Sequence, residues 1–405
     1  MIDFSYLYAG RESGSTPHRY GQALKAAQSI PSEQRHAVAQ SASSRKPIVV
    51  WNISRTCNLT CEHCYTASGP MAYKGELTTD EGKRMIDDLA EFKIPALLLS
   101  GGEPILRPDF FELAEYAVSK KLRLVVSTNG TLITPEVAER LKKTGFTYVG
   151  ISLDGLREVH DHFRRKQGAF DLTVAGFRNC MKVGQKVGLR LTLTKSTARD
   201  LPGIFDFIEA EGIQRVCFYH LVPAGRGKGV EDLTLSESRG VIDAILARTK
   251  KWAEQNRSIE LLTVDNHCDG PYLYLKLIAE GRTEHAKKVL DFMRWNGGGL
   301  YSSGVGIADV DFNGNVHADQ FWMTYSFGNV RERRFSEIWQ DVSDPIMAGL
   351  KNRKGKVTGR CATCCWFDMC GGAMRSRAFN ATGDPWASDP GCYLTDEEIK
   401  AIPTA

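Results

Sequence analysis

Hydrophobic residues between positions 46 and 225 gather in short runs, separated by longer amphipathic segments. Short apolar runs bounded by polar turns are typical of buried parallel strands, and the segments between them are long enough for crossover helices. The six runs are 48–53, 96–100, 122–127, 148–153, 187–193 and 216–222, and the helical segments lie near 79–91, 109–119, 135–143, 171–184 and 200–211. This alternation predicts an α/β fold, a partial (β/α)6 TIM-like barrel whose chemistry lies at the carboxyl ends of the strands.

The chain on either side of this stretch follows other patterns. Residues 1–45 are rich in Ser, Gln and Ala, which predicts an extension with at most a weak helix near 20–28. After the glycine-rich loop 224–229, the pattern predicts helices at 236–255 and 272–293, a strand at 259–264, a β-hairpin turning at Asn313-Gly314 and a helix near 335–350. We expect four parts: an N-terminal extension (1–45), the barrel (46–225), a linker and helical bridging region (226–303) and a small α+β domain (304–405).

Composition narrows the class of protein. Of the 405 residues, 42% are hydrophobic and 25% charged, the proportions of a globular enzyme. The net charge of +4, without a long run of one sign, argues against a nucleic-acid or membrane partner. No apolar stretch is long enough to span a bilayer, and the N-terminus lacks the features of a signal peptide, so we expect a cytoplasmic protein. In that reducing compartment, eleven cysteines suggest metal or redox chemistry.

The first candidate site is the cysteine loop, residues 57–64, which follows the first strand. Cys57, Cys61 and Cys64 supply three thiolates, so a cluster of four irons bound there keeps one iron open to an outside ligand. A zinc site that takes a further ligand from elsewhere is the alternative.

The sequence CNLTCEHCY at 57–65 resembles the signature of the radical S-adenosylmethionine (SAM) superfamily. The resemblance implies a [4Fe-4S] cluster, SAM as cofactor, a 5'-deoxyadenosyl radical, and a low-potential electron donor such as a flavodoxin or ferredoxin. Residues at the following strand ends resemble the family's SAM contacts. They are the glycine motif Gly101, Gly102, Glu103 and Pro104, which would receive the amino group with Glu103 buttressing the loop, and Ser127, Asn129, Ser152 and Asp154, which would bind the carboxylate and ribose. Taken singly, each Ser or Asn is equally well explained as a turn residue.

A second group of cysteines, which we name the C-terminal cysteine set, comprises Cys361, Cys364, Cys370 and Cys392. Four thiolates suit a fully coordinated [4Fe-4S] cluster, with structural zinc as the alternative. The spacing resembles the auxiliary-cluster extension called SPASM or twitch, but Asp319 and Met374 stand where the full pattern has cysteines, so we expect one auxiliary cluster. Cys365 is left out because it adjoins Cys364. Cys180 and Cys217 are interpreted as ordinary buried residues, and Cys268 is left unassigned.

Six further segments resemble the tetrapyrrole-tailoring branch of the superfamily: KPIVVWNISRTCNLTCEHCY, CFYHLVPAGRGKG, LTVDNHCDGPY, GNVHADQFW, FGNVRERRFSEIW and DPGCYLTDEEI. This resemblance implies removal of carboxylate side chains from an iron tetrapyrrole, most closely deacetylation of 12,18-didecarboxysiroheme to Fe-coproporphyrin III in haem biosynthesis. The auxiliary cluster is then expected to accept a surplus electron. The alternatives are propionate removal in haem d1 synthesis, a peptide-modifying radical SAM enzyme, and a non-enzymatic electron carrier with two clusters.

No catalytic residue is identified from the sequence, but a substrate with several carboxylates around an iron needs cationic partners and an axial ligand. Arg164, Arg165 and Arg226 are the candidates for the carboxylates, and His220, His267 and His317 are the candidates for iron or carboxylate contact.

Overall fold

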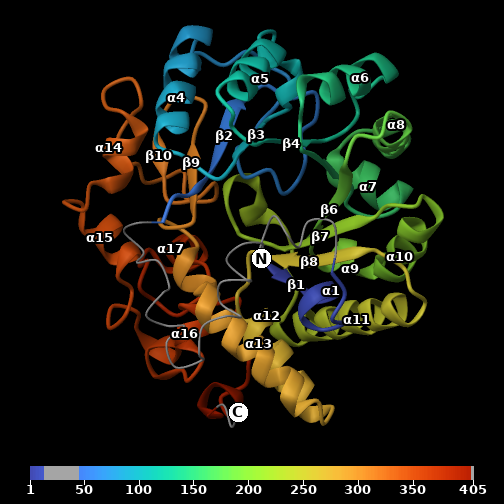
Figure 1. Ribbon diagram of the computed structural model, residues 1–405, viewed down its shortest axis with the longest axis vertical. Helices are drawn as coiled ribbons and strands as arrows, with labels where there is room; N and C mark the ends of the chain where they lie inside the picture. The colour runs from blue at the N-terminus through green and yellow to red at the C-terminus, as the bar shows by residue number, and fades with distance from the viewer. Residues whose placement is uncertain (13–44, 403–405) are drawn as a thin grey trace.

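The computed structural model describes residues 1–12 and 45–402, and these residues form one large sheet with helices packed around it (Figure 1). The strands are β1 Ile2–Asp3, β2 Ile48–Ser54, β3 Leu97–Gly101, β4 Leu124–Thr128, β5 Tyr148–Ser152, β6 Val187–Leu193, β7 Arg215–His220, β8 Glu260–Val264, β9 Ile307–Val310 and β10 Val316–His317. The helices are α1 Phe4–Leu7, α4 Thr79–Glu91, α5 Phe110–Ser119, α6 Pro135–Thr144, α7 Arg157–Arg164, α8 Ala169–Lys182, α9 Lys195–Arg199, α10 Leu201–Ala210, α11 Leu235–Glu254, α12 Asp269–Ala279, α13 Thr283–Asn296, α14 Phe335–Gln340, α15 Pro345–Lys351, α16 Phe367–Cys370 and α17 Arg375–Thr382. None of these helices is long and apolar enough to cross a membrane.

The sheet has the order β1-β8-β7-β6-β5-β4-β3-β2-β9-β10. Strands β2 to β8 pair in parallel, each with its neighbour in the chain, which confirms the predicted partial barrel. Strand β8 comes from the predicted bridging region and extends the parallel part of the sheet by one strand. On the other side, β9 pairs in parallel with β2, so the C-terminal part of the chain continues the same sheet.

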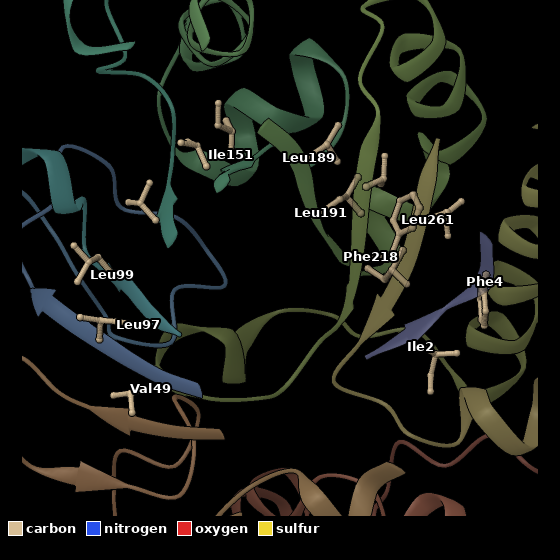
Figure 2. Packing of buried hydrophobic residues seen from close by; sticks show 14 of the residues in the cluster. Ile2, Phe4, Val49, Leu97, Leu99, Ile151, Leu189, Leu191, Phe218 and Leu261 are labelled. Atoms are coloured by element: carbon tan, nitrogen blue, oxygen red, sulfur yellow. The ribbon is translucent and has the colours of Figure 1, made fainter. Parts of the chain in front are cut away.

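Buried aliphatic side chains hold the helices against the sheet. Figure 2 shows them along the strands, among them Leu97 and Leu99 of β3 and Leu189 and Leu191 of β6, all at most 1% exposed. The crossover helices begin where the sequence supplies caps. Thr78 and Glu81 form a reciprocal capping box at the start of α4, so two otherwise unpaired N–H groups are satisfied.

The N-terminal residues take part in the fold, although the sequence predicted only an extension there. Strand β1 pairs antiparallel with β8, and Phe4 is fully buried beside it. The hydroxyl of Tyr8 donates to Glu280 at 2.7 Å. Two residues are too few to show the alternation of a strand, which is why the hydrophobic pattern gave no sign of β1. The weak helix expected near 20–28 lies outside the described residues.

The elements after β8 follow the predicted order with two differences. The helix predicted at 272–293 is two helices, α12 and α13, because Gly281 between them has a φ of +72°. The helix predicted near 335–350 is likewise divided into α14 and α15. The hairpin turns at Asn313-Gly314 as predicted, and Gly314 has the positive φ of +86° that such a turn favours.

If the N-terminal residues are part of the core, Phe4→Ala will destabilise the protein by about 3–5 kcal/mol, the usual cost of removing a buried aromatic ring. Thermal unfolding monitored by circular dichroism measures the change. Leu235→Ala, at a side chain that is 46% exposed, is the matched control and should shift the midpoint little. Equal shifts in the two variants would contradict the packing of Phe4.

Candidate functional site

The carboxyl ends of the parallel strands surround a cavity of about 110 Å³. Its wall includes His63 and Tyr65 from the cysteine loop and the residue after it, together with Ser127, Ser152 and Asp154 from the ends of β4 and β5. Residues from three distant parts of the sequence therefore meet there, as predicted for strand ends in such a barrel.

The three thiols of the cysteine loop lie together with Leu59 in one buried cluster. Cys57 and Cys61 are buried and Cys64 is half-buried. Burial raises the pKa of Cys57 to about 12, and it also raises the pKa of Cys61, against the opposing effect of Arg164. The thiolate is the form that binds a metal, so metal binding at these thiols would displace their protons. This donor set, three thiols on one loop, fits a four-iron cluster with an open iron.

The glycine motif is fixed to the cysteine loop by main-chain hydrogen bonds. The N–H groups of Gly102 and Glu103 donate to the carbonyls of Ser54 and Thr56 at 2.7 and 2.9 Å. A Cβ atom on Gly102 would lie 2.2 Å from the carbonyl oxygen of Thr56. The sequence predicted that these glycines let a ligand approach the backbone. In the structure, the lack of a side chain at Gly102 also allows two loops to pack closely against each other.

Glu103 ties the glycine motif to the next strand end. Its fully buried carboxylate accepts hydrogen bonds from Thr128 Oγ1 and from the N–H of Asn129, both at 2.8 Å. Burial raises the pKa of Glu103 to about 7, although these donors oppose the shift. The carboxylate therefore serves the buttressing role expected of it. The side chain of Asn129 faces the cysteine loop and donates to Asn58 Oδ1 at 2.9 Å.

Asp154 and Arg164 form a buried ion pair beside the cysteine loop. Arg164 also donates to the sulfur of Cys61 at 3.5 Å, and Asp154 accepts from the N–H of Thr192 at 2.7 Å. Although burial opposes it, Arg164 holds the pKa of Asp154 below its usual value. The sequence proposed Arg164 as a partner for substrate carboxylates, but its guanidinium is already engaged with Asp154 and Cys61.

The other predicted cations and histidines have different surroundings. Arg226 donates to the carbonyls of Cys61 and Ser68, both at 2.8 Å, and so supports the cysteine loop, whereas Arg165 is exposed. Of the three histidines, His220 lines the cavity. Nδ1 of His317 donates to the carbonyl of Tyr325 at 2.7 Å, and its Nε2 lies 3.3 Å from Oδ2 of Asp311. His267 is buried near Gly299, and neither histidine lines the cavity.

The C-terminal cysteine set gathers around α16. Burial raises the pKa of Cys370 well above its usual value, and the negative charge of Cys392, Cys361, Asp389 and Cys364 adds to that effect, so Cys370 lies near enough to the other three thiols for their charge to act on it. Cys365 is exposed and stands apart, as expected. Among the described residues, no three His, Cys, Asp or Glu side chains are arranged to hold a single metal ion.

Two buried arginines lie close to this set. Arg353 and Arg375 are 2% and 0% exposed, and both donate to main-chain carbonyl oxygens. Burial and the neighbouring Arg375 lower the pKa of Arg353 to about 9. Buried cations of this kind need negative charge nearby, and a cluster held by four thiolates supplies it. The set therefore fits an anionic iron-sulfur cluster.

Cys268 is a neighbour of the C-terminal cysteine set that the sequence left unassigned. It is fully buried, and its hydrogen bond to Cys392 is the largest cause of lowering the pKa of Cys392 to about 7. Asn266, two residues earlier, donates to the carbonyl of Gly391 at 2.8 Å. Nothing in the spacing of Cys268 indicated this contact, because it joins segments more than a hundred residues apart.

Comparison with known proteins places this geometry in context. A model of the Radical SAM superfamily matches residues 51–208. The chain is 53% identical over 404 residues to the Fe-coproporphyrin III synthase of Methanosarcina barkeri, covering 98% of this chain and 99% of that one. It is 41% identical to the pre-heme d1 synthase of Dinoroseobacter shibae, covering 87% of each chain.

Two solved structures share the fold. Streptococcus suis SuiB bound to S-adenosylmethionine superposes with a TM-score of 0.68 at 18% identity, covering 87% of this chain and 78% of that one. Native anSMEcpe with bound AdoMet gives a TM-score of 0.66 at 20% identity, covering 85% and 93%. At these identities the likeness speaks for the fold alone.

Gly102→Ala tests the packing of the glycine motif. Because the added methyl group would collide with the main chain of Thr56, we expect the cysteine loop to shift and both iron and SAM binding to fall after anaerobic reconstitution. Iron analysis and equilibrium dialysis with labelled SAM measure the two quantities. Gly240→Ala, where a Cβ meets nothing within 4 Å, is the control. Loss of SAM binding with full iron content would instead assign Gly102 to the ligand alone.

Proposed function

The chain belongs to the radical SAM superfamily, and from that premise we propose that it removes two acetate side chains from 12,18-didecarboxysiroheme to give Fe-coproporphyrin III. The observation that carries this proposal is the 53% identity, along almost the whole of both chains, to a protein named Fe-coproporphyrin III synthase. The segments that resemble the tetrapyrrole-tailoring branch support the same substrate class.

A second candidate is the removal of propionate side chains. It is favoured by the 41% identity to a pre-heme d1 synthase, which covers less of each chain than the first match. A peptide substrate has weaker support, since it rests on the fold shared with SuiB, which binds the precursor peptide SuiA, at 18% identity.

In this proposal the cysteine loop holds a [4Fe-4S] cluster and the cavity above it holds SAM. Together, when bound, they supply a 5'-deoxyadenosyl radical. The proposed SAM contacts are the glycine motif and, at the cavity wall, Ser127 and Ser152. Asn129 and Asp154, which the sequence also assigned to SAM, position the cysteine loop: Asn129 through Asn58, and Asp154 through Arg164. The cation of Arg164 offsets negative charge on Cys61.

The C-terminal cysteine set is the proposed site of the auxiliary [4Fe-4S] cluster. Arg353 and Arg375 are buried away from water, and their positive charges offset the negative charge of the cluster. Arg353 also joins the loop at Gly299 to the loop at Ser303, so the same cation that balances the cluster fixes the chain around it.

An acidic flavodoxin or ferredoxin is the proposed electron donor. A surface groove beside the cysteine loop is lined by four basic residues, Arg165, Lys195, Arg199 and Arg226, against two acidic ones, Glu62 and Glu231. Glu62 belongs to the cysteine loop, so a carrier bound in this groove stands next to the first cluster. Complementary charge of this kind accelerates encounter between partners.

Anaerobic turnover tests the proposed reaction. The reconstituted protein, given didecarboxysiroheme, SAM and dithionite, should release acetate and form Fe-coproporphyrin III, both measurable by mass spectrometry. The parent should contain about eight irons, the sum of two four-iron clusters. The triple variant Cys57→Ala/Cys61→Ala/Cys64→Ala should lose about half of that iron and form no 5'-deoxyadenosine.

Two further variants complete this test. Cys370→Ala should lose the other half of the iron and still cleave SAM, whereas Cys365→Ala should keep all of it. Release of propionate-derived fragments by the parent would favour the second candidate. If no tetrapyrrole were changed, both candidate functions would be refuted.

Charge reversal tests the donor surface. Lys195→Glu/Arg199→Glu should slow reduction of the first cluster by flavodoxin about tenfold or more at low salt, since electrostatic steering changes association rates by 10–10³-fold. Stopped-flow absorbance follows the reduction. Reduction by dithionite should be unaffected, and so should the rate with flavodoxin for Lys250→Glu/Lys251→Glu on α11. Equal slowing in both double variants would remove the groove from consideration.

A further inference from the structure

A histidine paired with a buried carboxylate stands in the wall of the cavity. His220 is the last residue of β7, lines the cavity and is 7% exposed. Its Nε2 atom lies 3.1 Å from Oδ2 of Asp269, the fully buried first residue of α12. Because Nε2 is engaged by the carboxylate, Nδ1 is the nitrogen available to a molecule in the cavity.

Tyr393 binds the second oxygen of the Asp269 carboxylate. The Tyr393 hydroxyl donates to Asp269 Oδ1 at 2.6 Å, and its ring stacks beside that of His220 with 6.3 Å between centroids. Tyr393 directly follows Cys392, so the histidine and its carboxylate are built onto the C-terminal cysteine set. The cavity and the proposed auxiliary cluster therefore share one hydrogen-bonded unit of three side chains.

The buried carboxylate of Asp269 is held at both of its oxygens. A carboxylate removed from water is stable only when it is paired and hydrogen-bonded, and Nε2 of His220 and the hydroxyl of Tyr393 are its partners. Although burial opposes it, His220 lowers the pKa of Asp269. Asp232 is another charged group near the imidazole, since Arg377 and His220 both act to lower its pKa. Arg190 and Asp265 are charged residues of the cavity wall.

The proposed reaction needs a proton at this place. When the 5'-deoxyadenosyl radical takes a hydrogen atom from a ring carbon, an unpaired electron remains there. Homolysis of the neighbouring bond to the acetate side chain gives one electron to the new C=C bond and leaves the other on a carboxymethyl fragment. That fragment becomes acetate by gaining one electron, from a low-potential one-electron donor, and one proton. This accounting requires an electron to be delivered, and not removed as the sequence had suggested.

We propose that His220 is the catalytic proton donor to the departing side chain, with Asp269 and Tyr393 as its positioning residues. The inference rests on the proposed deacetylation and adds to it the source of the proton. The imidazole gives its Nδ1 proton to the fragment as the new C–H bond forms, and Asp269 keeps the ring oriented throughout. A later proton from water restores the imidazolium.

His220→Ala is the decisive variant, measured after the parent has been shown to release acetate from didecarboxysiroheme. We expect full iron content, 5'-deoxyadenosine formation within about twofold of the parent, and acetate release lowered about 100-fold, the usual scale of general acid catalysis. In an equal mixture of H₂O and D₂O, the deuterium fraction of the acetate methyl group should differ between parent and variant, because the donor changes from imidazolium to water.

Three results would overturn the proposal: acetate release at the parent rate, an unchanged deuterium fraction, or loss of tetrapyrrole binding in visible absorption, which would assign His220 to the substrate iron. Failure of the parent to release any acetate would refute the deacetylation itself.

Two tyrosines with adjacent rings provide the matched pair for the positioning role. Tyr393→Phe removes the hydroxyl that fixes Asp269, and it should lower acetate release and change the deuterium fraction without altering the iron content. Tyr272→Phe removes a hydroxyl that donates to Asp243 at 2.7 Å, on a ring 5.4 Å from that of Tyr393, and should change neither. Equal effects in the two variants would reduce Tyr393 to a packing residue and remove it from the proposal.

Discussion

The main-chain pairing of the cysteine loop with the glycine motif is the contact on which the site depends. The N–H groups of Gly102 and Glu103 donate to the carbonyls of Ser54, the last residue of β2, and Thr56, which directly precedes the cysteine loop. A side chain on Gly102 would collide with the carbonyl oxygen of Thr56. The carboxylate of Glu103 accepts hydrogen bonds from Thr128 and Asn129, and so fixes the glycine motif to the end of β4. The positions of the thiols, the cavity wall and the next strand end therefore follow from a few backbone bonds that any shift of register would break.

Much of the fold and part of the site can be predicted from the sequence. Strands β2 to β7 were predicted because parallel strands buried on both faces form continuous apolar runs, and the cysteine loop because its spacing is local. The engagement of Arg164 by Asp154 and Cys61 could not be predicted, since a sequence does not say which way a side chain points. The contact of Cys268 with Cys392 joins distant segments and has no local signature.

The two cysteine groups differ in how their charge is balanced. Beside the cysteine loop, Arg164 is paired with a carboxylate, so little net positive charge is left for a cluster. Around the C-terminal set, Arg353 and Arg375 donate to carbonyl oxygens, and the negative groups that face them include Asp319 and Asp389 as well as Cys370. Local charge is one of the terms that set the reduction potential of a cluster, so clusters bound at the two sites would meet different electrostatic surroundings.

The pairing of β1 with β8 affects the order of events during synthesis. Ile2 aligns with Thr263, so during synthesis β1 finds its partner only after more than two hundred and fifty further residues have been added. Until then Phe4 has no buried surface to pack against, because β8, the strand with which β1 pairs, has not yet been synthesised. The sheet is consequently closed at this edge by a segment that is synthesised long before the strand with which it pairs, so this pairing is a late, non-local folding step.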